Sequence, residues 1–93
     1  MSTQIKRTKV DAASVARLGS HKHVVGAKQI RKALQSGNAR QVFLAQNADP
    51  AITEPIEALC QRNNVEYAWV RSMTDLGQAC GIEVGAAAAA VVA

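Results

Sequence analysis

Short apolar runs alternate along most of this chain with longer segments in which apolar residues recur at helical spacing. Residues 42–45 are a short apolar run, residues 65–70 are rich in β-branched and aromatic side chains, and residues 22–26 look like a very short strand or extended entry. Strands that alternate with helices in this way predict a sheet covered by helices on both faces. The chain should therefore have an α/β fold.

Residues 27–36 give the clearest helical pattern. They place three aliphatic side chains on one face and end at Gly37, a good helix stop; the three are Ile30, Ala33 and Leu34. The other helices should begin after residues whose side chains can cap a helix, namely Asp11, Asp49 and Ser72. Gly77 and Gly81 should limit the last of them.

The alanine-rich segment 86–92 is ambiguous. Alanine favours a helix locally, but the glycine-rich loop before it and the pair Val91-Val92 fit a buried central strand. We predict a strand here, which completes the alternation of helices and strands.

Size and composition point to one small domain. The chain has 93 residues, of which 48% are hydrophobic, and residues 1–10 lack any apolar period. We expect a flexible basic arm over residues 1–10 and a single domain over residues 11–93. Cys60 and Cys80 are too few for a disulfide framework and should be buried, reduced thiols. No segment resembles a membrane span or a secretory signal, which predicts a cytoplasmic protein.

The net charge of +4 is unevenly distributed. Residues 1–40 hold nine Lys or Arg and one acidic residue, whereas residues 41–93 hold two Arg and six acidic residues. A molecule polarised in this way raises the local concentration of polyanions at its basic side. The pattern favours a nucleic acid over an acidic metabolite as the partner.

The sequence contains no arrangement of side chains typical of an enzyme. A catalytic site needs a nucleophile with a base, a pair of carboxylates or a set of metal ligands. The acidic residues are scattered over helix surfaces and turns, and the pair His21 and His23 lies far along the chain from both cysteines. We expect a non-enzymatic protein without a metal or cofactor.

Two short segments are candidate binding sites, and the first is residues 26–32. Gly26 precedes a helix start, which leaves free backbone N–H groups and the positive end of the helix dipole close to any phosphate. Lys28, Gln29 and Lys32 can share one exposed face and could bind phosphates or read base edges. A merely solvated helix face has the same pattern.

The second segment is residues 81–85, a loop bracketed by two glycines that carries Ile82 and Val84. Such a loop could seat an unstacked nucleobase. It could equally fold both apolar side chains into the edge of the domain. The residues alone leave both possibilities open.

At these segments the sequence resembles the L7Ae and L30e ribosomal protein family, in particular its short bacterial members that bind kink-turn RNA. The resemblance covers approximately residues 24–92. Its most specific parts are residues 26–29 with 32–34, the turn at residues 48–50 and the long run 76–87. It implies a three-layer α/β/α sandwich with a four-stranded mixed sheet, in agreement with the alternation of elements.

The resemblance also implies binding to the kink-turn, a sharply bent RNA in which tandem sheared G·A pairs follow a short internal loop. Carried over by position, Lys28, Gln29 and Lys32 would meet the guanines and nearby phosphates. Arg31 lies on the same solvent face, and Gly26 would allow close backbone approach. Archaeal members usually carry Asn-Glu in place of Lys28-Gln29, which implies a different and more basic contact here.

By the same resemblance, Ile82, Glu83 and Val84 would line the loop that holds a flipped-out nucleotide. The expected function is that of a monomeric, non-catalytic RNA-binding protein that stabilises a kink-turn in ribosomal RNA or a riboswitch, in association with the ribosome. The alternative is a protein-interaction module of the same fold that docks through the loop from Ile82 to Val84.

Overall fold

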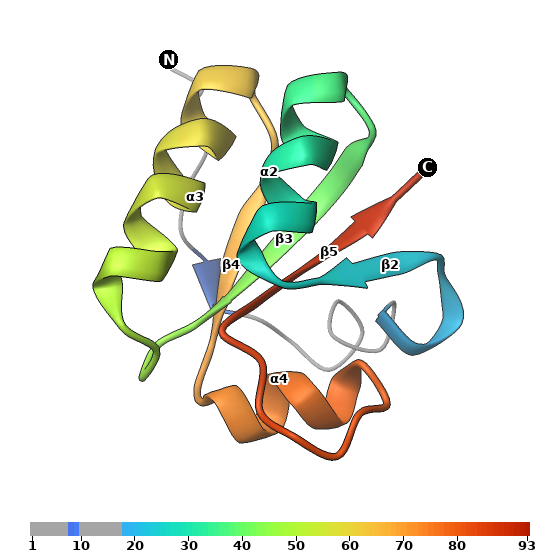
Figure 1. Cartoon of the computed structure of the whole chain (residues 1–93), viewed down its shortest axis with the longest axis vertical. Helices are drawn as coiled ribbons and strands as arrows, with labels where there is room; N and C mark the ends of the chain where they lie inside the picture. The colour runs from blue at the N-terminus through green and yellow to red at the C-terminus, as the bar shows by residue number, and fades with distance from the viewer. Residues whose placement is uncertain (1–7, 10–17) are drawn as a thin grey trace.

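The computed structural model describes residues 8–9 and 18–93, in which helices and strands alternate along the chain (Figure 1). The predicted helix over residues 27–36 is confirmed, and the other predicted elements differ by a few residues at their ends. Residues 18–20 form a helical segment, whereas most of the helix expected after Asp11 lies outside the described residues. In chain order the elements are β1 (Thr8–Lys9), β2 (His23–Val25), α2 (Ala27–Ser36), β3 (Ala39–Ala45), α3 (Pro50–Asn63), β4 (Tyr67–Val70), α4 (Met73–Ala79) and β5 (Ala88–Val92).

The strands form one mixed sheet in the order β1-β4-β3-β5-β2. β3 runs parallel to β4, where Phe43 lies opposite Ala68, and antiparallel to β5, where Phe43 lies opposite Ala89. β5 also pairs antiparallel with the edge strand β2. The strands β2 to β5 confirm the predicted four-stranded mixed sheet, and β1 adds two residues beside β4.

Strand β1 falls in the segment for which we expected a flexible arm. Thr8–Lys9 pair in parallel with β4 at Ala68 and Trp69. Two residues are too few to show a period, so the sequence carries no signal for this edge strand. Residues 1–7 and 10 lie outside the described residues, and the arm stays a prediction there.

Alternate residues of β3 supply two separate cores, because side chains along a strand point to opposite faces of the sheet. Val42 and Leu44 pack in the core beneath α2 and α3, whereas Phe43 and Ala45 pack in the core that includes α4. Figure 1 shows α2 and α3 side by side over the sheet and α4 apart from them. The predicted three-layer α/β/α sandwich is confirmed.

The alanine run of β5 is buried in the middle of the sheet. Ala88, Ala89 and Ala90 lie between β3 and β2 and are at most 1% exposed. Pairing on both sides overrides the local helix preference of alanine, and small side chains let the helical layers approach both faces closely. The strand prediction is confirmed, with the first strand residue at Ala88 instead of residue 86.

Both cysteines are buried and free, as predicted. Burial raises the pKa of the Cys60 thiol to about 12, with a smaller contribution from the Glu57 carboxylate, and burial also raises the pKa of Cys80. Both thiols therefore stay protonated at neutral pH and are poor nucleophiles. None of the helices in the described residues combines the length and apolarity needed to cross a membrane.

Candidate nucleic-acid interface

The first turn of α2 lacks the side-chain cap that the other two complete helices have. Asp49 accepts a hydrogen bond from Ala51 N at the start of α3 (2.9 Å), and Ser72 accepts one from Asp75 N at the start of α4 (3.1 Å). Gly26 occupies the same position in α2 and has no side chain to offer. Among the residues that the structure describes, none caps the first backbone N–H groups of α2 with a side chain, so these groups can meet an external acceptor at the positive end of the helix dipole.

Gly26 itself has a backbone conformation that L-residues rarely adopt, with φ of 108° and ψ of 141°. A Cβ placed on it would have no heavy atom within 4 Å, so the space beside its backbone is open. Gly26 N donates to Ala88 O (3.3 Å), which ties the start of α2 to the start of β5. The glycine is required by backbone geometry, and its open side lets a ligand approach the main chain.

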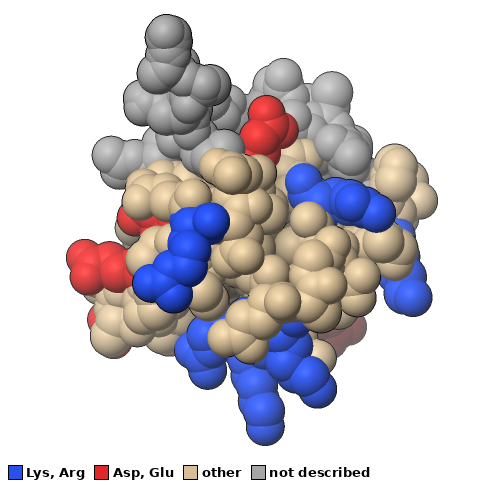
Figure 2. Space-filling model, turned by 90° about the horizontal axis from the view of Figure 1, so that it is seen from above, with Lys and Arg blue, Asp and Glu red and all other residues tan. Residues whose placement is uncertain are grey.

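The outer face of α2 carries the four polar residues of segment 26–32 that were predicted to bind. Lys28, Gln29, Arg31 and Lys32 are exposed, while the helix buries its apolar face against the sheet and α3. No residue of α2 is acidic, so the helix contributes only positive charge. Figure 2 shows a group of Lys and Arg side chains at one edge of the molecule, apart from most of the acidic side chains.

An open groove lies along one side of this face. It has a volume of about 540 Å³ and runs between α2 and the adjacent ends of β2 and β5. Gln29 and Lys32 line it, whereas Lys28 and Arg31 do not, so the predicted polar residues fall into two sets. Lys22 also lines the groove. We did not predict a role for Lys22, since its place depends on the pairing of β2 with β5.

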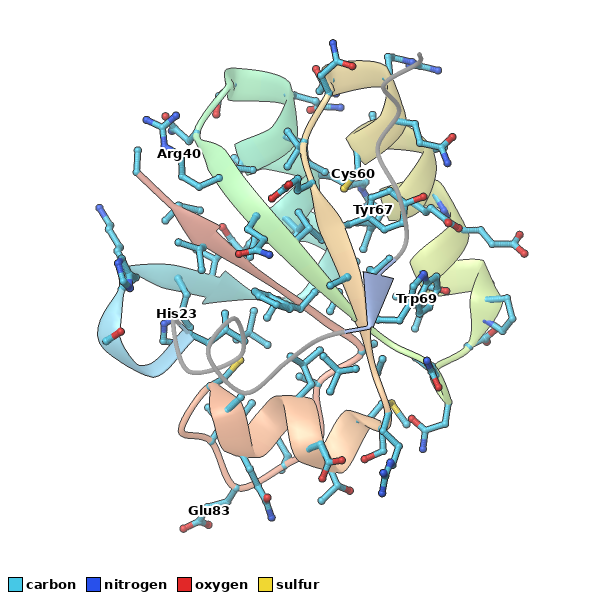
Figure 3. All side chains as sticks on the ribbon, turned by 180° about the vertical axis from the view of Figure 1, so that it is seen from behind. His23, Arg40, Cys60, Tyr67, Trp69 and Glu83 are labelled. Atoms are coloured by element: carbon cyan, nitrogen blue, oxygen red, sulfur yellow. The ribbon has the colours of Figure 1, made fainter. Side chains whose placement is uncertain are left out.

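The loop over residues 81–85 divides its two apolar side chains between the core and solvent. Ile82 is half-buried and packs against the core that contains Phe43 and Leu76, whereas Val84 is 70% exposed. Glu83 is exposed and lies at the outer end of the loop (Figure 3). The possibility that both apolar side chains fold into the domain is therefore correct for Ile82 and wrong for Val84, and the seating of a nucleobase by this loop stays a prediction.

Close contact with α4 holds this loop in place. A Cβ on Gly77 would overlap the carbonyl oxygen of Val84, and one on Gly85 would lie 3.1 Å from the Met73 Cβ. Ile82 N donates to Gly77 O (3.1 Å). Gly77 thus lies within α4, and the loop packs against it. The prediction that Gly77 limits the helix is wrong, because α4 extends to Ala79.

The family is decided by comparison with known sequences. A model of the ribosomal protein L7Ae/L30e/S12e/Gadd45 family matches residues 8–93. The chain belongs to this family. The resemblance that we inferred from residues 26–34, 48–50 and 76–87 is therefore confirmed.

Bacterial relatives match most of this L7Ae-family chain. It is 45% identical over 69 residues to an RNA-binding protein of Bacillus pumilus (strain SAFR-032), with 74% of this chain and 84% of the relative covered. It is 44% identical over 75 residues to the RNA-binding protein YbxF of Geobacillus stearothermophilus, with 81% and 92% covered.

Solved structures share the architecture. A 15.5 kD RNA binding protein of Giardia lamblia superposes with a TM-score of 0.77 at 27% identity, over 85% of this chain and 68% of that one. A protein of unknown function from Bacillus halodurans superposes with a TM-score of 0.77 at 22% identity, over 89% and 87%. The second likeness concerns the fold alone.

In this L7Ae-family chain, the two predicted segments are linked through β5. The loop leads directly into β5, whose first residue, Ala88, accepts the hydrogen bond from Gly26 N. Val25, just before the α2 start, and Ile82 pack against the same core. The helix start and the loop are thus supported by one shared set of buried side chains.

Proposed function

We propose that this protein binds RNA, that it recognises a kink-turn, and that it acts as a monomer without catalysis on ribosomal RNA or another structured RNA. The observation that carries the proposal is the start of α2, where an uncapped helix and an open glycine backbone adjoin Lys28, Gln29 and Lys32. Membership of the L7Ae/L30e/S12e/Gadd45 family and relatives named RNA-binding protein support it.

The helix start suits a distorted RNA groove better than a regular duplex. The major groove of A-form RNA is too deep and narrow for side chains to enter, whereas tandem sheared G·A pairs widen it. Lysine and glutamine side chains can then reach guanine edges, and the free N–H groups of α2 can meet a phosphate. The open side of Gly26 leaves room for the RNA backbone to approach.

The loop over residues 81–85 would bind the unpaired part of the same RNA. Val84 presents an exposed apolar surface to a flipped-out base, while Ile82 anchors the loop in the core. The exposed Glu83 carboxylate could accept a hydrogen bond from a base amino group. A rigid support favours binding because little freedom is lost when the base docks.

The proposal is tested by titrating two RNAs that differ only in the G·A pairs. One is a kink-turn, and the other has Watson-Crick pairs at these positions. We expect the kink-turn to bind at least about tenfold more tightly, because the contacts need the distorted groove. Equal affinities for the two RNAs would overturn the proposal.

The exposed Val84 also allows a second function, in which the loop docks on a protein. Salt distinguishes the two. RNA binding should weaken steeply as salt is added because counterions return to the phosphates, whereas apolar docking should barely respond. Salt-independent binding of a partner protein, together with equal affinity for the two RNAs, would favour the protein-docking function.

A further inference from the structure

The groove beside α2 extends beyond the residues that we propose to contact the kink-turn. Five of the ten described residues that line it come from α2 between Gln29 and Ser36. The others come from β2, from β5, from their flanks and from Asn38, which lies between α2 and β3. Its walls are tied together, because Val92 N donates to Lys22 O (2.9 Å) and Ala93 N donates to Asn38 O (3.0 Å). The groove is therefore a fixed part of the surface, built on the edge of the sheet.

The groove is lined by basic and polar side chains together with small aliphatic ones. Lys32 of α2 and Lys22, just before β2, both line it, and none of the described lining residues has an acidic side chain. Its neutral polar groups are amides and a hydroxyl, and its apolar groups are small aliphatic side chains; they include Gln35, Ser36, Val24 and Ala33. No aromatic side chain is found among the described residues that line it, so these residues offer no platform on which a nucleobase could stack.

This chemistry fits a sugar-phosphate backbone better than a base. Lysines bind phosphates as point charges. Amides and hydroxyls donate hydrogen bonds to phosphate oxygens or bond to a ribose 2′-hydroxyl. The aliphatic side chains can pack against the ribose ring. Such contacts position an RNA strand without reading its sequence. A strand, and not an isolated ion, also matches a groove of about 540 Å³.

We infer that this groove is a second RNA contact, which holds the backbone of a strand that continues outward from the kink-turn. The inference rests on the proposed kink-turn function. Gln29 and Lys32 belong both to the α2 contact surface and to the groove, so a strand leaving the G·A pairs on that side runs into it. Lys22 is then the charged residue among the described groove residues that contacts only the extension.

The test compares a minimal kink-turn RNA with RNAs in which each strand end is lengthened in turn, at several salt concentrations. One extension should raise the affinity by about three- to tenfold. It should also steepen the slope of log affinity against log salt concentration by the amount expected for release of roughly one more counterion. Lys22→Gln should abolish this gain but leave the affinity for the minimal RNA unchanged. Arg62→Gln removes an equal charge from an exposed α3 residue outside the groove and should keep the gain.

Two results would overturn the inference while leaving the proposed function intact. One is that no extension raises the affinity although the minimal kink-turn still binds better than its Watson-Crick version. The other is that the gain survives in Lys22→Gln or is lost equally in Arg62→Gln. Loss of the preference for G·A pairs would instead show that the proposed function has failed.

Discussion

Gly77 of α4 lies against the main chain of Val84 so closely that a Cβ on the glycine would overlap the Val84 carbonyl oxygen. Gly77 also accepts a hydrogen bond from Ile82 N (3.1 Å). One glycine thus sets how near the candidate nucleotide-binding loop comes to its supporting helix. A residue outside the proposed contact surface can therefore determine the position of residues within it.

Gly77→Ala should displace the loop, because the clash involves backbone atoms that cannot rotate away. We expect a loss of about 1–3 kcal/mol in the free energy of unfolding, as in other overpacked sites. Kink-turn affinity should also fall, measured under conditions in which the variant remains folded. Gly19→Ala is the control, since its Cβ would lie at an ordinary 3.8 Å from Ala79 O. Equal effects of the two substitutions would contradict this account.

Gly26→Ala should be destabilising for a different reason. Its site is open, but φ of 108° strains any side chain, at a cost of about 1–3 kcal/mol in the free energy of unfolding. Chemical unfolding measures the cost. Gly37→Asn is the control, because Gly37 has left-handed φ and ψ of 80° and 12°, which asparagine tolerates. An unchanged stability in Gly26→Ala would show that the helix start can relax.

Lys32→Ala should weaken kink-turn binding by about 1–3 kcal/mol if Lys32 contacts a guanine edge. Lys32 is exposed, so the free energy of unfolding should barely change. Arg62→Ala removes the same charge from the exposed surface of α3 and should have a much smaller effect on affinity. Similar losses in the two variants would indicate attraction by overall charge instead of a contact at α2.

Val84→Ser should leave stability almost unchanged, because the side chain is 70% exposed. It should nevertheless weaken binding to a kink-turn with an extruded loop nucleotide, since the apolar surface offered to the base is lost. The comparison RNA lacks that nucleotide, and its affinity should be the same for both proteins. A uniform loss for both RNAs would argue against a nucleotide seat at Val84.

Cys60 should make stability depend on pH under alkaline conditions. Burial raises its thiol pKa from 9.0 to about 12, so above pH 9 the unfolded chain releases a proton that the folded chain keeps. The free energy of unfolding should fall as pH rises from 9.0 towards 12, by up to about 1.4 kcal/mol per pH unit. Urea unfolding of the native protein and Cys60→Ala should show a shallower decline for the variant. Parallel declines would contradict the prediction.

Local patterns were enough to predict the order of the elements from β2 to β5 and the bounds of α2. Helix 27–36 is defined by its own apolar period and by Gly37, so its bounds follow from nearby residues. The difference in burial between Ile82 and Val84 could not be predicted, because it depends on where the loop packs against Gly77 of α4. The groove with Lys22 depends on the register in which His23 pairs with Val91, which no local pattern specifies.

Strand β2 pairs, within the described residues, with β5 alone, and Val25 lies opposite Ala89 near the other end of the chain. The start of α2 is therefore attached to the sheet by the strand that is synthesised after every other strand described. Until β5 has formed, Gly26 has no Ala88 carbonyl to bind, and the loop has no fixed end. The surface that we propose to bind RNA is therefore complete only once β5, the last described strand along the chain, has joined the sheet.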